Sequence, residues 1–265
     1  MAFDFGNYTA SANGTDDRAF GAASAVVTAA PFTVHAWQYR PSAASSAAST
    51  LWSVANSGVG NQLLSGFQSG GGDLSFLIRN GGVNVNGGTG PAGVGLDAWT
   101  SCGFVASSTT NRQVFVNGAG GTVNTTSLSP SGLNQTAIGT AYKVTPGDWF
   151  GGFLGEVAIW NVALTVHEIA ALAKWGRKAT TIRPASLVMY QPMRGAINET
   201  GSIGPTFSAI GSASAPAKAS THPPVRIVRI VRPQSSLVPP PGITLPRITQ
   251  SRGRRSQAHP HILTW

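Results

Sequence analysis

The sequence predicts an all-β protein, an antiparallel β-sandwich of the jelly-roll type with one short helix and an extended C-terminal arm. Gly accounts for 33 of the 265 residues, whereas charged residues make up only 10% of the chain. This composition favours strands joined by many tight turns. Short apolar runs also recur between clusters of Gly, Asn and Ser, a rhythm typical of sandwich strands.

Strand patterns recur along most of the chain. Residues 31–40 come first, and their apolar Phe32, Val34 and Ala36 alternate with a second, partly aromatic set, as in a central sandwich strand. The further predicted strands are residues 51–55, 62–67, 74–79, 83–86, 99–106, 112–116, 123–128, 136–139, 153–160 and, returning to the sheet last, 186–193. Asn117-Gly118 indicates a tight turn, although the glycines after it favour a longer hairpin loop.

The helix is predicted to begin at Thr165. Thr165 as N-cap and Glu168 three residues later form a capping-box pattern. Apolar residues then follow at helical spacing as far as Leu172, and Gly176 supplies a stop signal. These signals predict a helix of about ten residues at the edge of the sandwich.

Charge divides the chain into two parts. Residues 1–173 carry eight acidic and five basic residues, for a net charge of −3, and residues 174–265 carry thirteen Lys/Arg and one Glu, for +12. From about Ala209 the sequence becomes rich in small residues and proline. We therefore predict a sandwich domain over residues 1–208 and a basic arm over residues 209–265. Such an asymmetry indicates an acidic partner for the arm.

Cysteine content and hydropathy indicate the cellular compartment in which the protein is made. Cys102 is the only cysteine, which rules out an internal disulfide, and its apolar neighbours predict a buried structural thiol. The N-terminus lacks a secretory signal pattern, and the chain has no apolar run of about 18 residues. We expect synthesis in a cytosol and no membrane insertion.

The order of several motifs resembles a known family. These motifs are Phe32-Thr-Val-His-Ala-Trp37, a strand led by Trp99, Val114-Phe-Val-Asn-Gly118, and Phe153 to Trp160 followed by the capped helix. Together they resemble the laminin-G-like jelly-roll domains of the concanavalin A-like lectin/glucanase superfamily, over roughly residues 3–195. Gly155 stands where that family often has Asp before Glu156, so the resemblance implies no metal or catalytic role there. His222-Pro-Pro-Val225 and the last strand also resemble phage structural proteins.

Catalytic patterns are poorly represented. The glucanase branch needs two carboxylates at close range, but Asp97, Asp148, Glu156, Glu168 and Glu199 are isolated in the sequence. His35 on a predicted strand and His167 in the first helical turn are interpreted as structural rather than as members of a Ser/His/Asp site. The glycine-rich stretches lack the Gly-Lys-Ser/Thr ending of a phosphate loop. We predict that the protein is not an enzyme.

Two ligand classes remain as alternatives. Calcium needs hard oxygen ligands at fixed loop spacings, and the candidate residues Asp16, Asp17, Asn56 and Asp148 do not have such spacings. No metal or other cofactor is therefore predicted, with calcium as the alternative. A glycan would bind through aromatic side chains at the rim of the sandwich, for which the candidates are Trp52, Tyr142 and Trp149.

The arm carries the more specific signal. Residues 225–233 repeat an apolar-Arg-apolar triplet, which leaves open a β-strand or a polyproline II helix with its arginines on one ridge. Either form would be covered by the body or a neighbouring subunit, for instance by strand addition. The predicted partner contacts are Arg226, Arg229, Arg232, Arg252, Arg254, Arg255 and Trp265. A solvated charge run, an acidic protein partner and, less favoured, nucleic acid are the alternatives for this charge.

These observations lead to one functional hypothesis and two rivals. The first is a non-enzymatic structural protein of a virion, a phage capsid decoration or tail-associated protein, made in the host cytoplasm and held in the assembly by its arm. The second is a carbohydrate-binding lectin module for host attachment. The third and least favoured is a glycoside hydrolase.

Overall fold

The computed structural model describes residues 3–4, 18–42, 49–68, 72–81, 83–91, 94–142, 144–174, 177–194 and 196–211. The chain divides into two units, residues 1–226 and 227–265. Residues 212–265, and with them every predicted partner contact from Arg226 to Trp265, lie outside the described residues. Within the described part, no helix has the length and apolar character needed to cross a membrane.

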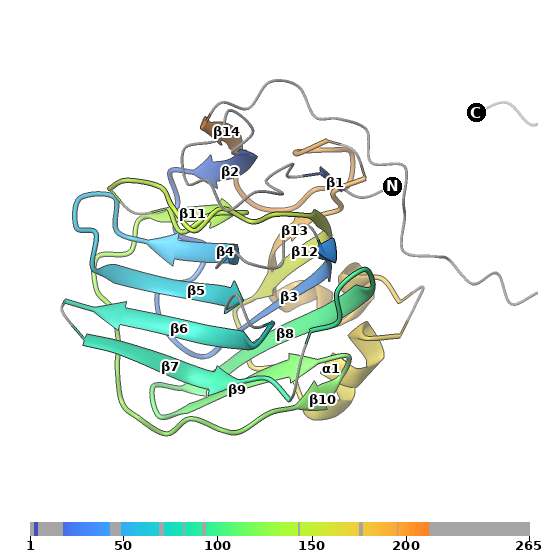
Figure 1. The fold of residues 1–265 in the computed structure, drawn as a ribbon, viewed down its shortest axis with the longest axis horizontal. Coiled ribbons are helices and arrows are strands. Elements are labelled where there is room, and N and C mark those ends of the chain that lie inside the picture. The colour runs from blue at the N-terminus through green and yellow to red at the C-terminus, as the bar shows by residue number, and fades with distance from the viewer. Residues whose placement is uncertain are drawn as a thin grey trace, which may run out of the picture. The chain divides into compact units, whose positions relative to one another are not determined.

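Two antiparallel sheets form the sandwich (Figure 1). Sheet A has the order β1-β12-β3-β8-β9-β10, with β13 also paired to β12, and sheet B has the order β14-β2-β11-β4-β5-β6-β7. The strands of sheet A are β1 (Phe3–Asp4), β3 (Phe32–Tyr39), β8 (Trp99–Ser108), β9 (Asn111–Val116), β10 (Ala119–Gly120), β12 (Phe153–Trp160) and β13 (Leu187–Gln191). Those of sheet B are β2 (Arg18–Ala22), β4 (Ser49–Ala55), β5 (Gln62–Gln68), β6 (Leu74–Asn80), β7 (Val83–Thr89), β11 (Gln135–Ile138) and β14 (Ser208–Gly211). This architecture confirms the predicted fold class.

The main core lies between the two sheets. Phe32 from β3 and Phe104 from β8 meet Trp52 and Phe76 from sheet B, with ring centroids 5.5–6.3 Å apart and edge-to-face geometry. Aromatic pairs favour this arrangement over face-to-face stacking. Gly66 on β5 makes room for it, because a Cβ there would lie 2.2 Å from Trp52 Nε1 and 2.7 Å from Phe104 Cζ. Residues 31–40 therefore alternate because one of the two faces of this strand packs on the core.

A second apolar cluster covers the outer face of sheet A. Helix α1 (Val166–Leu172), the 3₁₀ helices η2 (Ala179–Thr181) and η3 (Pro184–Ser186), and the turns between them form what we call the helical cover, residues 161–186. Its buried side chains pack on Phe115 and Trp160 of the sheet, and they are Leu164, Ile169, Leu172, Ala179 and Ile182. Trp160 Nε1 also donates a hydrogen bond to Ile182 O at 2.8 Å.

The helix has the predicted start and an earlier end. Thr165 and Glu168 form the complete capping box, in which Thr165 N donates to Glu168 Oε2 at 2.7 Å. The helix stops at Leu172 with Ala173 as C-cap, so the predicted length of about ten residues was too long. The turn begins before Gly176 because the backbone N–H of Lys174 already bonds Ala171 O in a tighter turn.

The hairpin after β9 is tighter than predicted. Val116 pairs directly with Ala119, so the loop contains only Asn117 and Gly118. Both adopt positive φ, 50° and 84°, the conformation that a two-residue turn needs to match strand twist. The glycines that follow therefore belong to β10 and its exit rather than to a longer loop.

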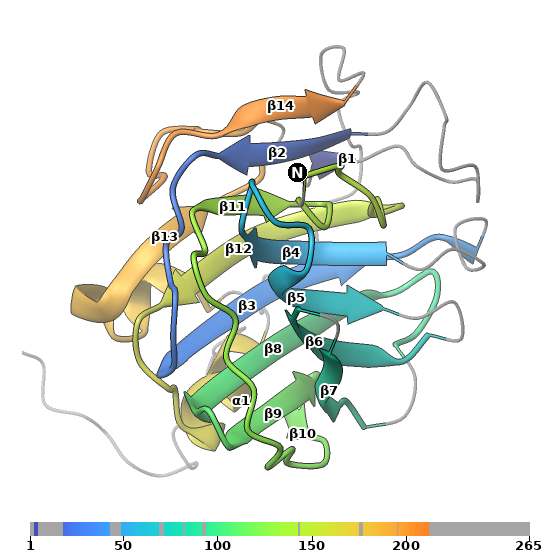
Figure 2. The same cartoon turned by 90° about the vertical axis from the view of Figure 1, so that its left-hand side faces the viewer.

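Residues 123–128 are not a strand, contrary to the sequence pattern. They belong to a long loop, residues 121–134, that runs from β10 to β11 (Figure 2), and within this loop the one β-bridge to a strand is Asn124–Arg112. Arg112 on β9 explains this, because its guanidinium binds the Thr126 and Leu128 carbonyl oxygens. Those oxygens are then engaged by a side chain instead of a neighbouring strand. We call residues 121–134 the arginine-held loop.

Two strands of sheet B escaped sequence analysis. β2 and β14 pair with each other, Ala209 opposite Phe20 and Ile210 opposite Ala19. The boundary predicted between residues 208 and 209 falls inside β14, so the paired residues of the sandwich extend to Gly211. A short small-residue segment such as Ser208–Gly211 has little strand signal of its own, and its partner β2 supplies the hydrogen bonds.

Candidate functional site

A row of three aromatic rings lies on the outer face of sheet A, at the end of the strands remote from the helical cover. Tyr39 of β3 pairs across the sheet with Phe153 of β12 on one side and with Trp99 of β8 on the other. The ring centroids are 5.7 Å apart for Tyr39–Phe153 and 5.8 Å for Tyr39–Trp99. We call these three residues the aromatic row.

The aromatic row is half-buried rather than covered. The interplanar angles, 72° to Phe153 and 54° to Trp99, show that the rings do not form one flat platform. Exposed Asp97 lies just before Trp99, and its Oδ1 accepts a hydrogen bond from Ser42 N. Half-exposed aromatic rings offer apolar contact to a ligand, and Asp97, two residues before Trp99 in the chain, offers a polar acceptor.

Sequence analysis missed this row. Its members end β3 and begin β8 and β12, so they are far apart in the chain, and only the register of the sheet brings them together. The available signal was an aromatic residue at the end of each of three predicted strands.

The predicted rim aromatics do not form one site. Trp52 is fully buried in the core between the sheets, so it cannot contact a ligand from solvent and the prediction for this residue is wrong. Tyr142 packs instead on the other face of sheet B, where a Cβ on Gly21 would lie 2.8 Å from its Cε1. Trp149 follows in the same connection and is half-buried. Tyr142 and Trp149 therefore remain predictions for ligand contact.

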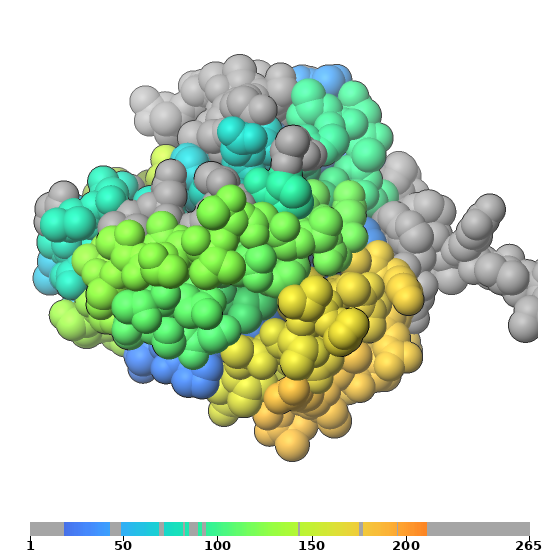
Figure 3. All heavy atoms as spheres, turned by 90° about the horizontal axis from the view of Figure 1, so that it is seen from below, coloured from blue at the N-terminus to red at the C-terminus, as the bar shows by residue number. Residues whose placement is uncertain are grey.

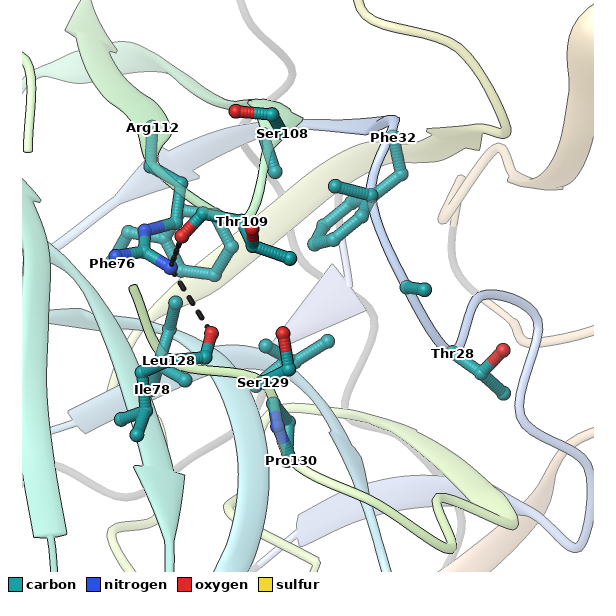
Figure 4. Close-up of a pocket in the computed structure, with 14 residues that line it drawn as sticks. Thr28, Phe32, Phe76, Ile78, Ser108, Thr109, Arg112, Leu128, Ser129 and Pro130 are labelled. Carbon is teal, nitrogen blue, oxygen red and sulfur yellow. Dashed lines mark hydrogen bonds between the residues drawn. The ribbon is translucent and has the colours of Figure 1, made fainter. Parts of the chain in front are cut away.

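A cavity opens between the sheets beside the arginine-held loop (Figure 4). It has an empty volume of about 300 Å³, part of it open to solvent, and is lined by Phe32, Phe76, Leu128 and Arg112 among others. Arg112 is only 2% exposed, and burial lowers the pKa of its guanidinium.

Almost all hydrogen-bond donors of the Arg112 side chain are paired within the protein. Nη1 donates to Thr109 O at 2.8 Å and to Leu128 O at 3.2 Å. Nη2 donates to Asn124 Oδ1 at 3.1 Å and to Thr126 O. Only Nε–H has no partner. Since all four terminal donors are used, the arginine serves to fix the loop, and the cavity does not offer a free cation to an anionic ligand.

His35 makes a buried contact that the sequence did not indicate. Its Nε2 lies 2.8 Å from Ser101 Oγ on the adjacent β8, and burial lowers the pKa of His35 to about 3. A nucleophilic serine needs a histidine that is oriented by a third group and open to substrate. Here Nδ1 has no partner and both residues are about 1% exposed, so the pair is structural.

Cys102 and His167 occupy the environments expected of them. Cys102 is a buried free thiol, as predicted, and burial raises the pKa of its thiol. His167 is exposed in the first turn of α1. Neither residue belongs to a group of three His, Cys, Asp or Glu side chains that could hold a metal ion among the described residues.

Glu156 is the most unusual carboxylate among the described residues. It sits at an irregularity of β12 with a positive φ of 50°, where Tyr190 Oη donates to its Oε1 at 3.2 Å. Burial raises the pKa of Glu156, while that hydrogen bond, the Ala179 N–H, Arg194 and Lys178 lower it. None of these neighbours is a carboxylate, so the second acid that glycoside hydrolysis requires is not among the groups that perturb Glu156.

The residues considered as calcium ligands lie in different environments. Asp16 and Asp17 lie outside the described residues, Asn56 Oδ1 accepts a hydrogen bond from Gly58 N, and Asp148 is exposed. Among the residues that the structure describes, no three His, Cys, Asp or Glu side chains gather as a metal site would need. The expectation of no metal stays a prediction.

A family model matches residues 13–170, more than half of the chain, and its description is concanavalin A-like lectin/glucanases superfamily. The chain belongs to this superfamily. Its members include both lectins and glucanases by name, so membership gives the fold and leaves binding or hydrolysis to the site. No curated protein matches the sequence.

Similar solved structures include three proteins from different organisms. A CBM40 of the Ruminococcus gnavus IT-sialidase, bound to α2,3-sialyllactose, is 17% identical over 56% of this chain and 84% of its own, with a TM-score of 0.48. The heptameric SAP-like pentraxin of Limulus polyphemus is 18% identical over 65% and 81%, with a TM-score of 0.49. NanB sialidase from Streptococcus pneumoniae is 18% identical over 53% of this chain and 24% of its own, with a TM-score of 0.45. Similarities this distant do not indicate a ligand.

Proposed function

We propose that this protein is a non-enzymatic structural protein of a virion, a phage capsid decoration or tail-associated protein, made in the host cytoplasm and attached through its C-terminal arm. The uneven charge carries this proposal. Residues 212–265, after the last strand of the sandwich, contain eight Lys/Arg and no Asp or Glu. A chain segment of this kind is attracted to an acidic partner over many contacts. No cofactor is required for such a role.

Virion incorporation tests the proposal. Deletion of residues 222–265 leaves every described strand and helix in the chain, and we expect it to abolish incorporation into the native particle. A full-length variant with Arg226, Arg229, Arg232, Arg252, Arg254 and Arg255 changed to Gln separates charge from chain length and should be lost in the same way. Normal incorporation of both variants, or absence of the parent protein from virions, would refute the proposal.

Glycan binding is the second candidate, and the aromatic row is the observation that favours it. Three half-buried rings on adjacent strands can contact the apolar face of a sugar, while Asp97 beside Trp99 is an acceptor for hydroxyl groups. On a glycan array, Trp99→Ala should remove specific binding and Tyr142→Ala should not. The reverse result would place the ligand at the rim predicted from sequence, and no specific binding by the parent chain would refute this function.

A further inference from the structure

We propose that the folded body itself carries a docking face for an acidic surface of a partner protein. This inference rests on the proposed structural role and adds a second contact to that of the arm. The face, which we call the basic ledge, is formed by the exposed side chains Lys174, Arg177, Lys178, Arg183 and Arg194.

The charge on the described surface is strongly segregated. Residues 174–194 contain five Lys/Arg and no Asp or Glu. Elsewhere, among the residues whose side chains the structure describes, Arg40 and Arg112 are buried, and Arg79 is the cation with solvent access. The acidic side chains with at least partial exposure are Asp73, Asp97, Asp148, Glu156, Glu168 and Glu199. Part of the positive charge of residues 174–265 therefore lies on the sandwich rather than on the arm.

The ledge is held firmly against sheet A. Ile182 and Ala179 are buried in the cluster under the helical cover. Trp160 Nε1 bonds Ile182 O at 2.8 Å, and the Ala179 N–H bonds the half-buried carboxylate of Glu156. The backbone between Lys178 and Arg183 is thus fixed to the sheet at two points, which reduces the cost of ordering this part of the ledge on binding. Figure 3 shows this segment, in yellow to orange, as a continuous outer surface.

The ledge cations are only partly neutralised within the molecule. Arg183 Nε lies 2.6 Å from Glu168 Oε1, in an ion pair whose side chains are 43% and 24% exposed. Lys178 and Arg194 both act on the carboxylate of Glu156. Lys174 and Arg177 lie one turn apart, with Arg177 N bonded to Lys174 O at 3.2 Å. Three of the cations face these two partly buried carboxylates, and Lys174 and Arg177 add to the charge, so the five cations leave a net positive field at the surface.

The pattern favours a protein partner over nucleic acid. Glu168 and Glu156 lie among the cations, and they would repel a continuous chain of phosphates passing over the ledge. A protein surface instead presents separate carboxylates, which can be placed opposite Lys174, Arg177 and Lys178 while avoiding Glu168.

The test compares two full-length variants with the same change in net charge. The ledge variant is Lys174→Gln, Arg177→Gln and Lys178→Gln, and the control is Ser107→Glu, Thr122→Glu and Thr206→Glu, at exposed positions outside the ledge. Each lowers the net charge by three and retains the arm. Binding to poly-L-glutamate and to a short DNA duplex is measured at an ionic strength of about 0.15 M, after thermal unfolding has shown that both variants are folded.

We expect the ledge variant to bind poly-L-glutamate about tenfold more weakly than the parent, and the control about twofold more weakly at most. Equal weakening in the two variants, or none in the ledge variant, would overturn the inference. Ledge-specific weakening with DNA but not with poly-L-glutamate would overturn the choice of a protein partner. These outcomes do not depend on virion incorporation, so failure of the ledge and failure of the proposed function are distinguished.

Discussion

The arginine-held loop and the helical cover are both long segments that pack on the sandwich, but different forces hold them. Residues 121–134 receive three hydrogen bonds from the terminal nitrogens of buried Arg112, with Leu133 in the core. Residues 161–186 are fixed by five buried apolar side chains over sheet A. The loop is therefore held largely by hydrogen bonds, of which Arg112 supplies more than any other side chain, whereas the cover is held by apolar burial.

The largest effect is expected at Arg112. Arg112→Met fills a similar volume but leaves the Thr109, Thr126 and Leu128 carbonyl oxygens without their donor, which should lower the free energy of unfolding by about 3–5 kcal/mol. Urea unfolding measures this loss. Arg79→Met, which removes a half-exposed arginine bonded to Asn84, should cost less than about 1 kcal/mol. Similar losses in the two variants would show that the loop does not depend on Arg112.

Removal of one apolar contact from the helical cover should have a smaller effect. Ile169 is fully buried, and Ile169→Ala should lower the free energy of unfolding by about 2–4 kcal/mol through lost burial and a cavity. Hydrogen exchange should show faster exchange in α1, with no change in residues 121–134. Faster exchange in both regions would indicate that the two segments are coupled rather than independent.

Acid should destabilise the folded protein through His35. This imidazole lies under sheet A's cover, opposite Gly103, and burial lowers its pKa from 6.5 to about 3. The unfolded chain therefore binds a proton below about pH 6.5 that the folded chain does not bind until about pH 3, so stability falls as the pH drops through this window. At about pH 4.5 the loss from this residue should be about 2–3 kcal/mol.

His35→Gln measures that contribution. Its free energy of unfolding should fall less between pH 7 and about pH 4.5 than that of the parent chain. His167→Gln removes an exposed imidazole instead and should retain the parent's acid loss. An unchanged acid loss in His35→Gln would contradict the buried, neutral state of His35.

The smallest effect is expected at the helix cap. Thr165→Ala removes the acceptor for Glu168 N and should lower the free energy of unfolding by about 1 kcal/mol. The thermal midpoint measures the change, with exposed Val166→Ala as the control. A loss as large as that of Ile169→Ala would mean that the cap, not apolar burial, holds the helical cover.

Several elements could be predicted because their signals are local. The alternation of Phe32, Val34 and Ala36 identified β3, and the pair Thr165 and Glu168 identified the start of α1. Residues 123–128 were wrongly predicted as a strand because their composition fits an extended loop as well as a strand. The hydrogen bonds from Arg112 on β9 to this segment distinguish the two. β14 was missed because its own residues carry little strand signal, and only its pairing with β2 identifies it as a strand.

The same contrast between local sequence signals and long-range contacts applies to the candidate sites. Trp52 looked like a rim aromatic, but the interior face of β4 buries it completely. Tyr39, Trp99 and Phe153 had no sequence signal as a group, because cross-strand register joins residues that are distant in the chain. The charge of residues 174–194 was summed with that of the arm in one basic stretch, residues 174–265, and the structure shows that these residues pack on sheet A.

The fold class, the capped helix, the buried thiol and the division of charge could be predicted, because each follows from composition or from residues within a few positions of one another. The sequence did not indicate which aromatic rings meet, which loop Arg112 holds or which cations share the surface of the body. Those outcomes depend on strand order and register, which are set by packing between distant segments rather than by any one of them.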